Sequence, residues 1–267
     1  MRRLILCSDD FAFSRAVSAT IAGLAHDGKL NAISCMAVMP GWSDDSALLH
    51  DLPPHVEIGL HLTLTEERPL TAMPGFAPDG ILPTINEVTR RASRGGVPLD
   101  EIAREVTAQF DAFIAAMGRP PAFVDGHQHS HVLPGIRGIV LAETARRAPG
   151  AWLRDCTDRL SAMLARPFLG KAIGSAYHSR GFRRDAAKLG LATNDSFAGH
   201  YDFAHDYAAI LPRMLRKPGR RHLVMCHPGA GERPGDTIAA ARPREADGLR
   251  TTNITDIAAR EGLAFPA

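Results

Sequence analysis

The stretch LILCSDDFAFS, residues 4–14, opens the chain with an apolar run that leads into two adjacent carboxylates. Its apolar part, residues 4–7, predicts a buried strand. The polar residues after it lead into a helix, for which Ser14 is a suitable N-cap and Gly28 a suitable C-terminal stop. Strand, loop and helix therefore form the first unit of the predicted fold.

The same unit recurs along the chain. Further apolar runs predict strands at residues 32–38, 56–64, 122–124, 151–153 and 222–226. Periodic apolar residues predict helices at residues 99–117 and 136–147, and weaker patterns predict helices near 160–169 and 207–215. Because parallel strands need crossover connections, this alternation predicts an α/β fold in which helices cover a parallel sheet.

Residues 68–98 break this pattern, because prolines and glycines recur throughout them. We interpret the segment as a long loop with at most a short helix, and loops of this length in a compact domain usually have a function, for instance as a lid over a site. No convincing linker divides the chain, and its 267 residues suit a single barrel. We therefore expect one domain, residues 1–267, with a lid-like insertion.

The composition excludes several classes of protein. With 31 basic and 29 acidic side chains the formal net charge is +2, and the charges are dispersed, which argues against nucleic acid as a partner. The longest apolar runs are far shorter than the ~20 residues that a transmembrane helix needs. Four scattered cysteines predict reduced core residues, and the N-terminus lacks a signal-peptide pattern, so we expect a cytoplasmic protein.

Histidine is enriched, with 12 residues, and several histidines follow predicted strands together with aspartates. These polar groups are Asp9 and Asp10, His61, the run DGHQHSH at residues 125–131, and His227. The carboxyl ends of parallel strands meet at one edge, where such folds gather ligands and catalytic groups. We therefore expect these sequence-distant segments to form one site.

The adjacent aspartates allow two interpretations. Side chains of neighbouring residues in an extended chain point to opposite sides, so one of Asp9 and Asp10 could coordinate a metal while the other accepts a proton. The alternative is a polar turn in which Asp10 or Ser14 caps the following helix. The position directly after a buried strand favours a functional pair.

Three histidines at alternating positions, His127, His129 and His131, favour a metal site. They share one face of an extended chain, whereas only His127 and His131 would share a helix face. Imidazole and carboxylate ligands suit zinc, iron or another divalent ion, with His61 as a further ligand. At most two of the three need to bind the metal, so the others would contact substrate or support the ligands.

Five segments together carry a resemblance that spans nearly the whole chain. They are SDDF at 8–11, IGLHLTL at 58–64, RPLT at 68–71, DGHQHSH at 125–131 and MCHPG at 225–229. In this set and order the chain resembles the YdjC-type carbohydrate deacetylases, which include chitooligosaccharide deacetylases and a hopanoid-associated branch. Residues 192–199 look more like the hopanoid-associated branch.

The resemblance implies a distorted (β/α) TIM-like barrel with one divalent metal ion, Mg²⁺ or Zn²⁺, as cofactor. The implied metal ligands are Asp10, His61 and His127. Family members commonly have Gly where this chain has Ala12, and the added methyl group could alter the turn beside the metal. The resemblance also suggests that two copies of the chain pair as a homodimer.

The resemblance further implies three catalytic roles. Asp9 matches the general base, His227 the general acid, and Arg154 a residue that orients the base. Independently of the resemblance, Arg154 could pair with a carboxylate and hold it ionised, and His227 would be either a working imidazole at a strand end or a packed histidine. His129 and His131 are expected to bind substrate.

These residues predict a hydrolase that removes the N-acetyl group of an acetylated amino sugar, in a chitooligosaccharide or in an acetylglucosaminyl lipid such as a hopanoid. Amide hydrolysis near neutral pH needs a polarised carbonyl, an activated water and a proton for the leaving amine, and the set provides a group for each. Two alternatives stay open. One is a metal-dependent phosphoesterase, which usually binds two ions, and the other is a non-catalytic sugar-binding barrel.

Overall fold

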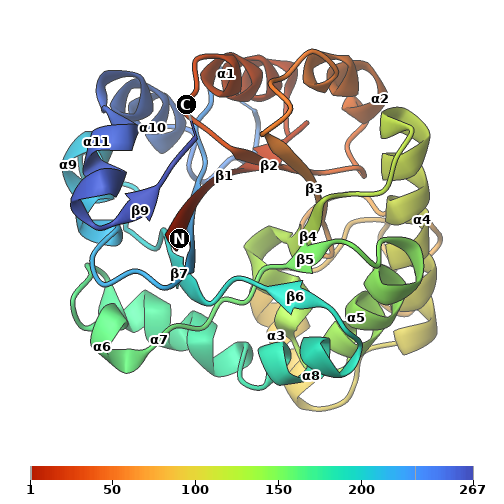
Figure 1. Ribbon diagram of the computed structural model, residues 1–267. Coiled ribbons are helices and arrows are strands. Elements are labelled where there is room, and N and C mark those ends of the chain that lie inside the picture. The colour runs from red at the N-terminus through yellow and green to blue at the C-terminus, as the bar shows by residue number, and fades with distance from the viewer. Residues whose placement is uncertain (1, 232, 267) are drawn as a thin grey trace.

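Parallel strands curl around a central axis and form an open barrel in the computed structural model, which describes residues 2–231 and 233–266. The strands are β1 (Arg2–Phe11), β2 (Ala32–Cys35), β3 (Glu57–Leu62), β4 (Phe123–Gly126), β5 (Trp152–Leu153), β6 (Ala192–Thr193), β7 (Ser196–Ala198), β8 (Arg221–Cys226) and β9 (Leu263–Ala264). Their order in the sheet is β6-β5-β4-β3-β2-β1-β8-β7, and β9 also pairs with β1. Figure 1 looks along the barrel and shows the helices outside the strands.

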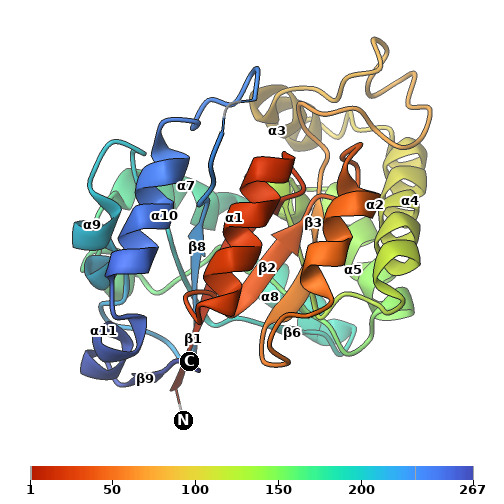
Figure 2. The same ribbon diagram turned by 90° about the horizontal axis from the view of Figure 1, so that it is seen from above.

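The helices pack around the strands and cover the outside of the barrel (Figures 1 and 2). They are α1 (Arg15–His26), α2 (Trp42–Asp45), η1 (Ser46–Leu49), α3 (Ile85–Ser93), α4 (Leu99–Met117), η2 (His127–Val132), α5 (Ile136–Arg147), α6 (Leu160–Met163), α7 (Leu169–His178), α8 (Phe182–Lys188), α9 (Tyr207–Met214), α10 (Ala241–Thr251) and α11 (Ile254–Arg260). Within the described ranges, none of them is long and apolar enough to cross a membrane. The parallel strands and the helices around them confirm the predicted α/β barrel class.

The first unit shows how local sequence builds this architecture. Residues 4–7 of β1 are fully buried, because the strand pairs with β2 on one side and β8 on the other while helices cover its outer face. Ser14 caps α1 as predicted, since its Oγ accepts a hydrogen bond from the backbone N–H of Val17 at 3.3 Å. The helix ends just before Gly28, which takes a φ of 67°.

Helices α4 and α5 have the predicted bounds, but β1, β2, β3 and β4 end at other residues than predicted, and β4 continues to Gly126 rather than ending at residue 124. β1 extends to Phe11 rather than ending at residue 7, so both aspartates lie within it. β2 ends at Cys35 and β3 at Leu62, earlier than predicted. The apolar runs continue beyond these strands because the following residues are buried without pairing in the sheet.

The segment 158–221 contains most of the errors in the prediction. A single helix at 160–169 is wrong, because α6 ends at Met163 and α7 begins only at Leu169. Pro167 and Phe168, which has a φ of 60°, separate the two helices. Helix α7 buries no residue and contains Gly170 and Gly174, which disfavour a helix, and β6 and β7 are two and three residues long.

The insertion at 68–98 contains one short helix, α3, which Thr84 caps through a hydrogen bond from the backbone N–H of Glu87. Figure 2 shows this insertion on the same side of the barrel as the loop between β8 and α10. Ile81, Leu82 and Ile85 of the insertion line a cavity at the carboxyl ends of the strands. The insertion therefore forms one wall of the region in which we expected the site.

Candidate active site

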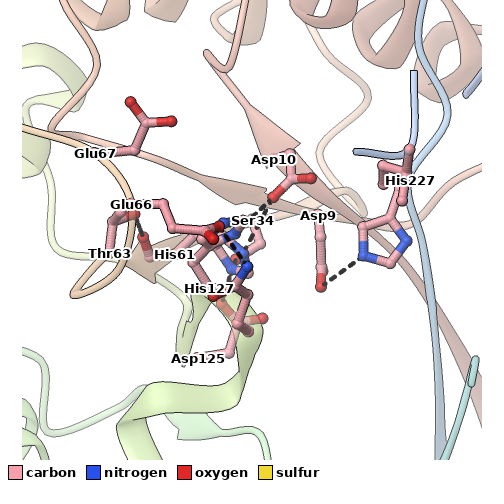
Figure 3. Close-up of polar contacts among 12 residues, drawn as sticks. Asp9, Asp10, Ser34, His61, Thr63, Glu66, Glu67, Asp125, His127 and His227 are labelled. Atoms are coloured by element: carbon pink, nitrogen blue, oxygen red, sulfur yellow. Dashed lines mark hydrogen bonds and ion pairs between the residues drawn. The ribbon is translucent and has the colours of Figure 1, made fainter. Parts of the chain in front are cut away.

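Three predicted metal ligands converge at the carboxyl ends of β1, β3 and β4 (Figure 3). Oδ1 of Asp10 lies 3.1 Å from Nδ1 of His127 and 3.5 Å from Nε2 of His61, and the three ligand atoms all lie within 4.8 Å of one another. Two donors bound about 2.1 Å from a tetrahedral ion are about 3.4 Å apart. The Asp-His-His set thus has the chemistry and the spacing to hold one divalent ion.

An irregular backbone brings both aspartates to the same cavity. The pairing register between β1 and β2 shifts between Ser8 and Phe11, and Asp10 has a φ of 65° within that interval. Regular alternation would send neighbouring side chains to opposite faces. Instead Asp9 and Asp10 both line the cavity but have different partners.

Asp9 pairs with Arg154 through two hydrogen bonds. Nη1 of Arg154 donates to Oδ2 at 2.6 Å and Nη2 donates to Oδ1 at 2.5 Å. The same guanidinium pairs with Asp125, and it is fully buried. Burial opposes its charge, but Asp125 and Asp9 outweigh that effect and raise the pKa of Arg154 above its usual range. Asp9 is therefore held in one orientation beside a permanent positive charge.

His61 is held by a carboxylate behind it. Its Nδ1 lies 2.7 Å from Oδ1 of Asp125 and 3.0 Å from Oγ of Ser34, which also donates to Asp125. Burial raises the pKa of Asp125, but Arg154 and His61 outweigh burial and lower the pKa to about 2. An ionised Asp125 can only accept, so Nδ1 of His61 carries a proton and Nε2 faces Asp10.

The surroundings of His61 attract positive charge. Burial lowers the pKa of the imidazole, but Asp125 and Asp10 outweigh burial and raise it to about 10. Without a metal ion, this environment favours a second proton on the ring. The same negative charges of Asp125 and Asp10 would also stabilise a divalent cation at Nε2. The electrostatics of the site therefore agree with the geometry of its donor atoms.

The DGHQHSH run does not place its three histidines on one face, as an extended chain would. It forms the 3₁₀ turn η2, in which Gln128 and His129 have φ values of 51° and 61°. His127 points to Asp10, whereas the ring of His129 packs edge-on against Phe197 at 5.5 Å. His129 lines the cavity and stays a proposed substrate contact.

His131 is placed differently from its prediction. It is fully buried, and its Nε2 lies 2.9 Å from the backbone carbonyl of Arg154, away from the cavity lining. Burial lowers its pKa to about 4. We therefore remove His131 from the proposed substrate contacts, because its neutral ring supports the segment that carries Arg154.

His227 follows β8 and faces Asp9 across the cavity (Figure 3). Its Nε2 lies 3.9 Å from Oδ2 of Asp9, and its Nδ1 lies 3.9 Å from Oε1 of Glu245. Glu245 is fully buried, accepts a hydrogen bond from the backbone N–H of His227 at 2.5 Å and another from the hydroxyl of Tyr201. His227 thus has a carboxylate on each side.

Sequence reasoning missed four supporting residues: Ser34, Glu245, Tyr201 and Arg242. Arg242 of α10 donates from Nη2 to Oδ2 of Asp10 at 2.9 Å. Burial raises the pKa of Asp10, but Arg242, His127 and His61 outweigh burial and hold it well below its usual range. No motif marks these residues, since each is an ordinary residue in a helix, loop or strand. Asp125 was noticed in its run but was given no role.

The candidate ligands and the candidate base and acid open onto a cavity of about 1000 Å³, whereas Arg154 lies behind Asp9 outside its lining. Asp9, Asp10, His61, His127 and His227 all line it. This volume lies at the upper end of the range for small-molecule sites, so it accommodates a substrate larger than a single sugar ring. Lys171 of α7 also lines the cavity, and its Nζ lies 5.3 Å from the ring centre of Phe203.

The fold and site together define an α/β barrel with a polar centre at the carboxyl ends of its strands. Within that class, the chain belongs to the YdjC family, because the model of the YdjC-like protein family matches residues 3–260.

Two curated relatives and one solved structure are similar to this chain. The chitooligosaccharide deacetylase of Enterobacter sp. (strain 638) is 34% identical over 144 residues, a match that covers 54% of this chain and only 56% of that protein. The chitooligosaccharide deacetylase of Klebsiella pneumoniae is 28% identical over 98% of this chain and 96% of that protein. A crystal structure from Enterococcus faecalis V583, provisionally assigned as a cellobiose-phosphate cleavage protein, has a TM-score of 0.73 at 20% identity and covers 99% of this chain and 97% of that one.

Proposed function

We propose that this protein is a metal-dependent carbohydrate deacetylase that hydrolyses the N-acetyl group of an acetylated amino sugar. The observation that carries the proposal is the joint placement of Asp10, His61 and His127 on one side of the cavity and of Asp9 and His227 beside them. The names of the two curated relatives support the reaction. The substrate is a chitooligosaccharide or an acetylglucosaminyl lipid such as a hopanoid.

One divalent ion, Mg²⁺ or Zn²⁺, is the proposed cofactor, with Asp10, His61 and His127 as its ligands. Two imidazoles and a carboxylate suit Zn²⁺ better than Mg²⁺, which prefers oxygen ligands. When bound, such an ion polarises the amide carbonyl and lowers the pKa of a bound water to about 7. The chain's own residues supply the remaining steps.

Asp9 is the proposed general base, because its carboxylate borders the cavity next to the ligand set. Arg154 donates a hydrogen bond to each oxygen of Asp9 and so fixes the orientation of this carboxylate beside the cavity. His227 protonates the departing amine, since it lines the cavity and its Nε2 lies 3.9 Å from Oδ2 of Asp9.

A two-metal phosphoesterase is less consistent with the site. Cys7, Asp9 and Asp125 form a second group whose ligand atoms lie within 4.8 Å of one another. The guanidinium of Arg154 contacts all three, at 3.3 Å from Sγ of Cys7. A second cation there would face a buried positive charge at contact distance, and the resulting repulsion favours a single ion.

Acetate release from N-acetylglucosamine oligosaccharides by metal-reconstituted protein tests the proposal. We expect the wild-type protein to release acetate and the variants Asp10→Ala and His127→Ala to lose at least a hundredfold in rate. His205→Ala is the matched control, because His205 is an exposed histidine that pairs with Asp202 outside the cavity lining. Wild-type rates in both ligand variants would refute the proposed mechanism. Parallel assays with an acetylglucosaminyl lipid decide between the two substrate types.

A further inference from the structure

The two oxygens of the Asp10 carboxylate have different partners. Oδ1 faces His127 and His61, at 3.1 and 3.5 Å, whereas Oδ2 accepts the hydrogen bond from Nη2 of Arg242 at 2.9 Å. Both Asp10 and Arg242 are only 2% exposed, so water does not compete for these contacts. One oxygen is therefore open to an ion shared with the histidines, and the other is occupied by the protein itself.

Arg242 is fixed from several sides. Its Nε donates to Oδ2 of Asp236 at 2.7 Å, and its guanidinium lies 4.7 Å from the ring centre of Phe13. Its backbone carbonyl accepts a hydrogen bond from the N–H of Gly229 at 3.2 Å, which ties the start of α10 to the segment after β8. A guanidinium held in this way cannot easily turn away when a cation approaches Asp10.

We propose that Arg242 is a positioning residue for the metal ion, which limits Asp10 to coordination through Oδ1 and keeps a fixed positive charge beside the ion. This inference rests on the metal site of the proposed function. A carboxylate can bind a cation through one oxygen or through both, and Arg242 removes the second option. The neighbouring positive charge also opposes binding of the ion. With Arg242 in place, the site therefore binds its ion more weakly than the same three ligands would without it. The ion also receives less negative charge from Asp10.

Titration of the metal-free protein with ZnCl₂ by isothermal calorimetry tests this role without any measurement of activity. Arg242→Gln removes the charge and frees Oδ2, so we expect it to bind Zn²⁺ at least tenfold more tightly than the wild-type protein. Arg242→Lys keeps a positive charge at this position and should bind within threefold of wild type. Arg250→Gln is the control, because Arg250 lies exposed on the same helix and pairs with Asp247.

The outcomes separate this inference from the proposed function. A wild-type protein that binds no Zn²⁺ overturns the metal site and this role with it. A wild-type protein that binds Zn²⁺, together with an Arg242→Gln variant that binds equally or more weakly, overturns only the role of Arg242. Circular dichroism first shows that each variant is folded, and Arg242→Met removes the same charge if the glutamine variant does not fold.

Discussion

Oδ1 of Asp125 lies 2.7 Å from Nδ1 of His61, whereas the other ring nitrogen, Nε2, points to Asp10. A carboxylate in this position fixes the orientation and tautomer of the imidazole and increases its basicity toward a cation. The same carboxylate pairs with Arg154, which in turn holds Asp9. The proposed metal ligand and the proposed base therefore share one buried network.

The first prediction concerns this carboxylate. Asp125→Asn weakens the hold on His61 and should lower Zn²⁺ affinity by about 10- to 100-fold. Calorimetric titration of the metal-free protein measures the effect. Ser34→Ala removes only the hydroxyl beside the same nitrogen and should have a smaller effect. Equal affinities for wild type and Asp125→Asn would show that Asp125 does not support the ligand.

The second prediction concerns Arg154, whose removal leaves two buried carboxylates without their cation. Arg154→Met should lower the free energy of unfolding by about 3–5 kcal/mol, the usual cost of leaving a buried charge unpaired. Urea unfolding measures it. Adding Asp125→Asn to Arg154→Met removes one of the unpaired charges and should restore part of the loss. A double variant less stable than Arg154→Met would contradict this explanation.

The third prediction concerns Ala12, where the resembling family commonly has Gly. Ala12 has a φ of 74°, a conformation that costs a residue with a Cβ roughly 1–2 kcal/mol. Glycine relieves this strain, but its greater conformational freedom in the unfolded chain lowers the free energy of unfolding by about 0.4–1 kcal/mol. Glycine also loses the burial of the Ala12 methyl group, worth about 0.8 kcal/mol, so Ala12→Gly should change the free energy of unfolding by less than about 0.5 kcal/mol in urea unfolding. Ala19→Gly, on the exposed side of α1, should destabilise it by about 1 kcal/mol.

The elements that sequence predicted well are those with a strong local pattern. The bounds of α4 and α5 follow from apolar periodicity, and Gly118, with a φ of 66°, ends α4. The segments of the site stood out because aspartates and histidines follow apolar strands, and the resemblance to the YdjC family then indicated Asp10, His61 and His127 as the ligands. Helix α7 gives a mixed signal, because its apolar residues recur at helical spacing but Gly170 and Gly174 interrupt them.

The supporting residues of the site depend on tertiary structure and so leave no trace in local patterns. Glu245 and Arg242 come from α10, almost the last helix of the chain, yet they contact His227 and Asp10. Their spacing of three fits any amphipathic helix. Likewise the 3₁₀ turn at His127 depends on left-handed residues other than glycine, which sequence patterns rarely reveal.

The last prediction concerns pH and a histidine remote from the site. His222 is fully buried, next to Ser196 and the backbone carbonyl of Met214, and burial lowers its pKa to about 3. Its pKa in the unfolded chain is about 6.5. Between these values the unfolded state binds a proton that the folded state does not, so stability is lost as the pH falls.

This single histidine should cost about 2 kcal/mol of unfolding free energy between pH 7 and pH 5, at about 1.4 kcal/mol per pH unit below 6.5. His131 and His200, each with a pKa of about 4, also contribute to the loss of unfolding free energy between pH 7 and pH 5. The test therefore compares this loss in the wild-type protein with the loss in each variant. His222→Gln should reduce the loss by about 2 kcal/mol in urea unfolding at the two pH values, whereas His26→Gln, an exposed histidine, should not. An equal loss in the wild-type and His222→Gln proteins would show that His222 accepts its proton in the folded state.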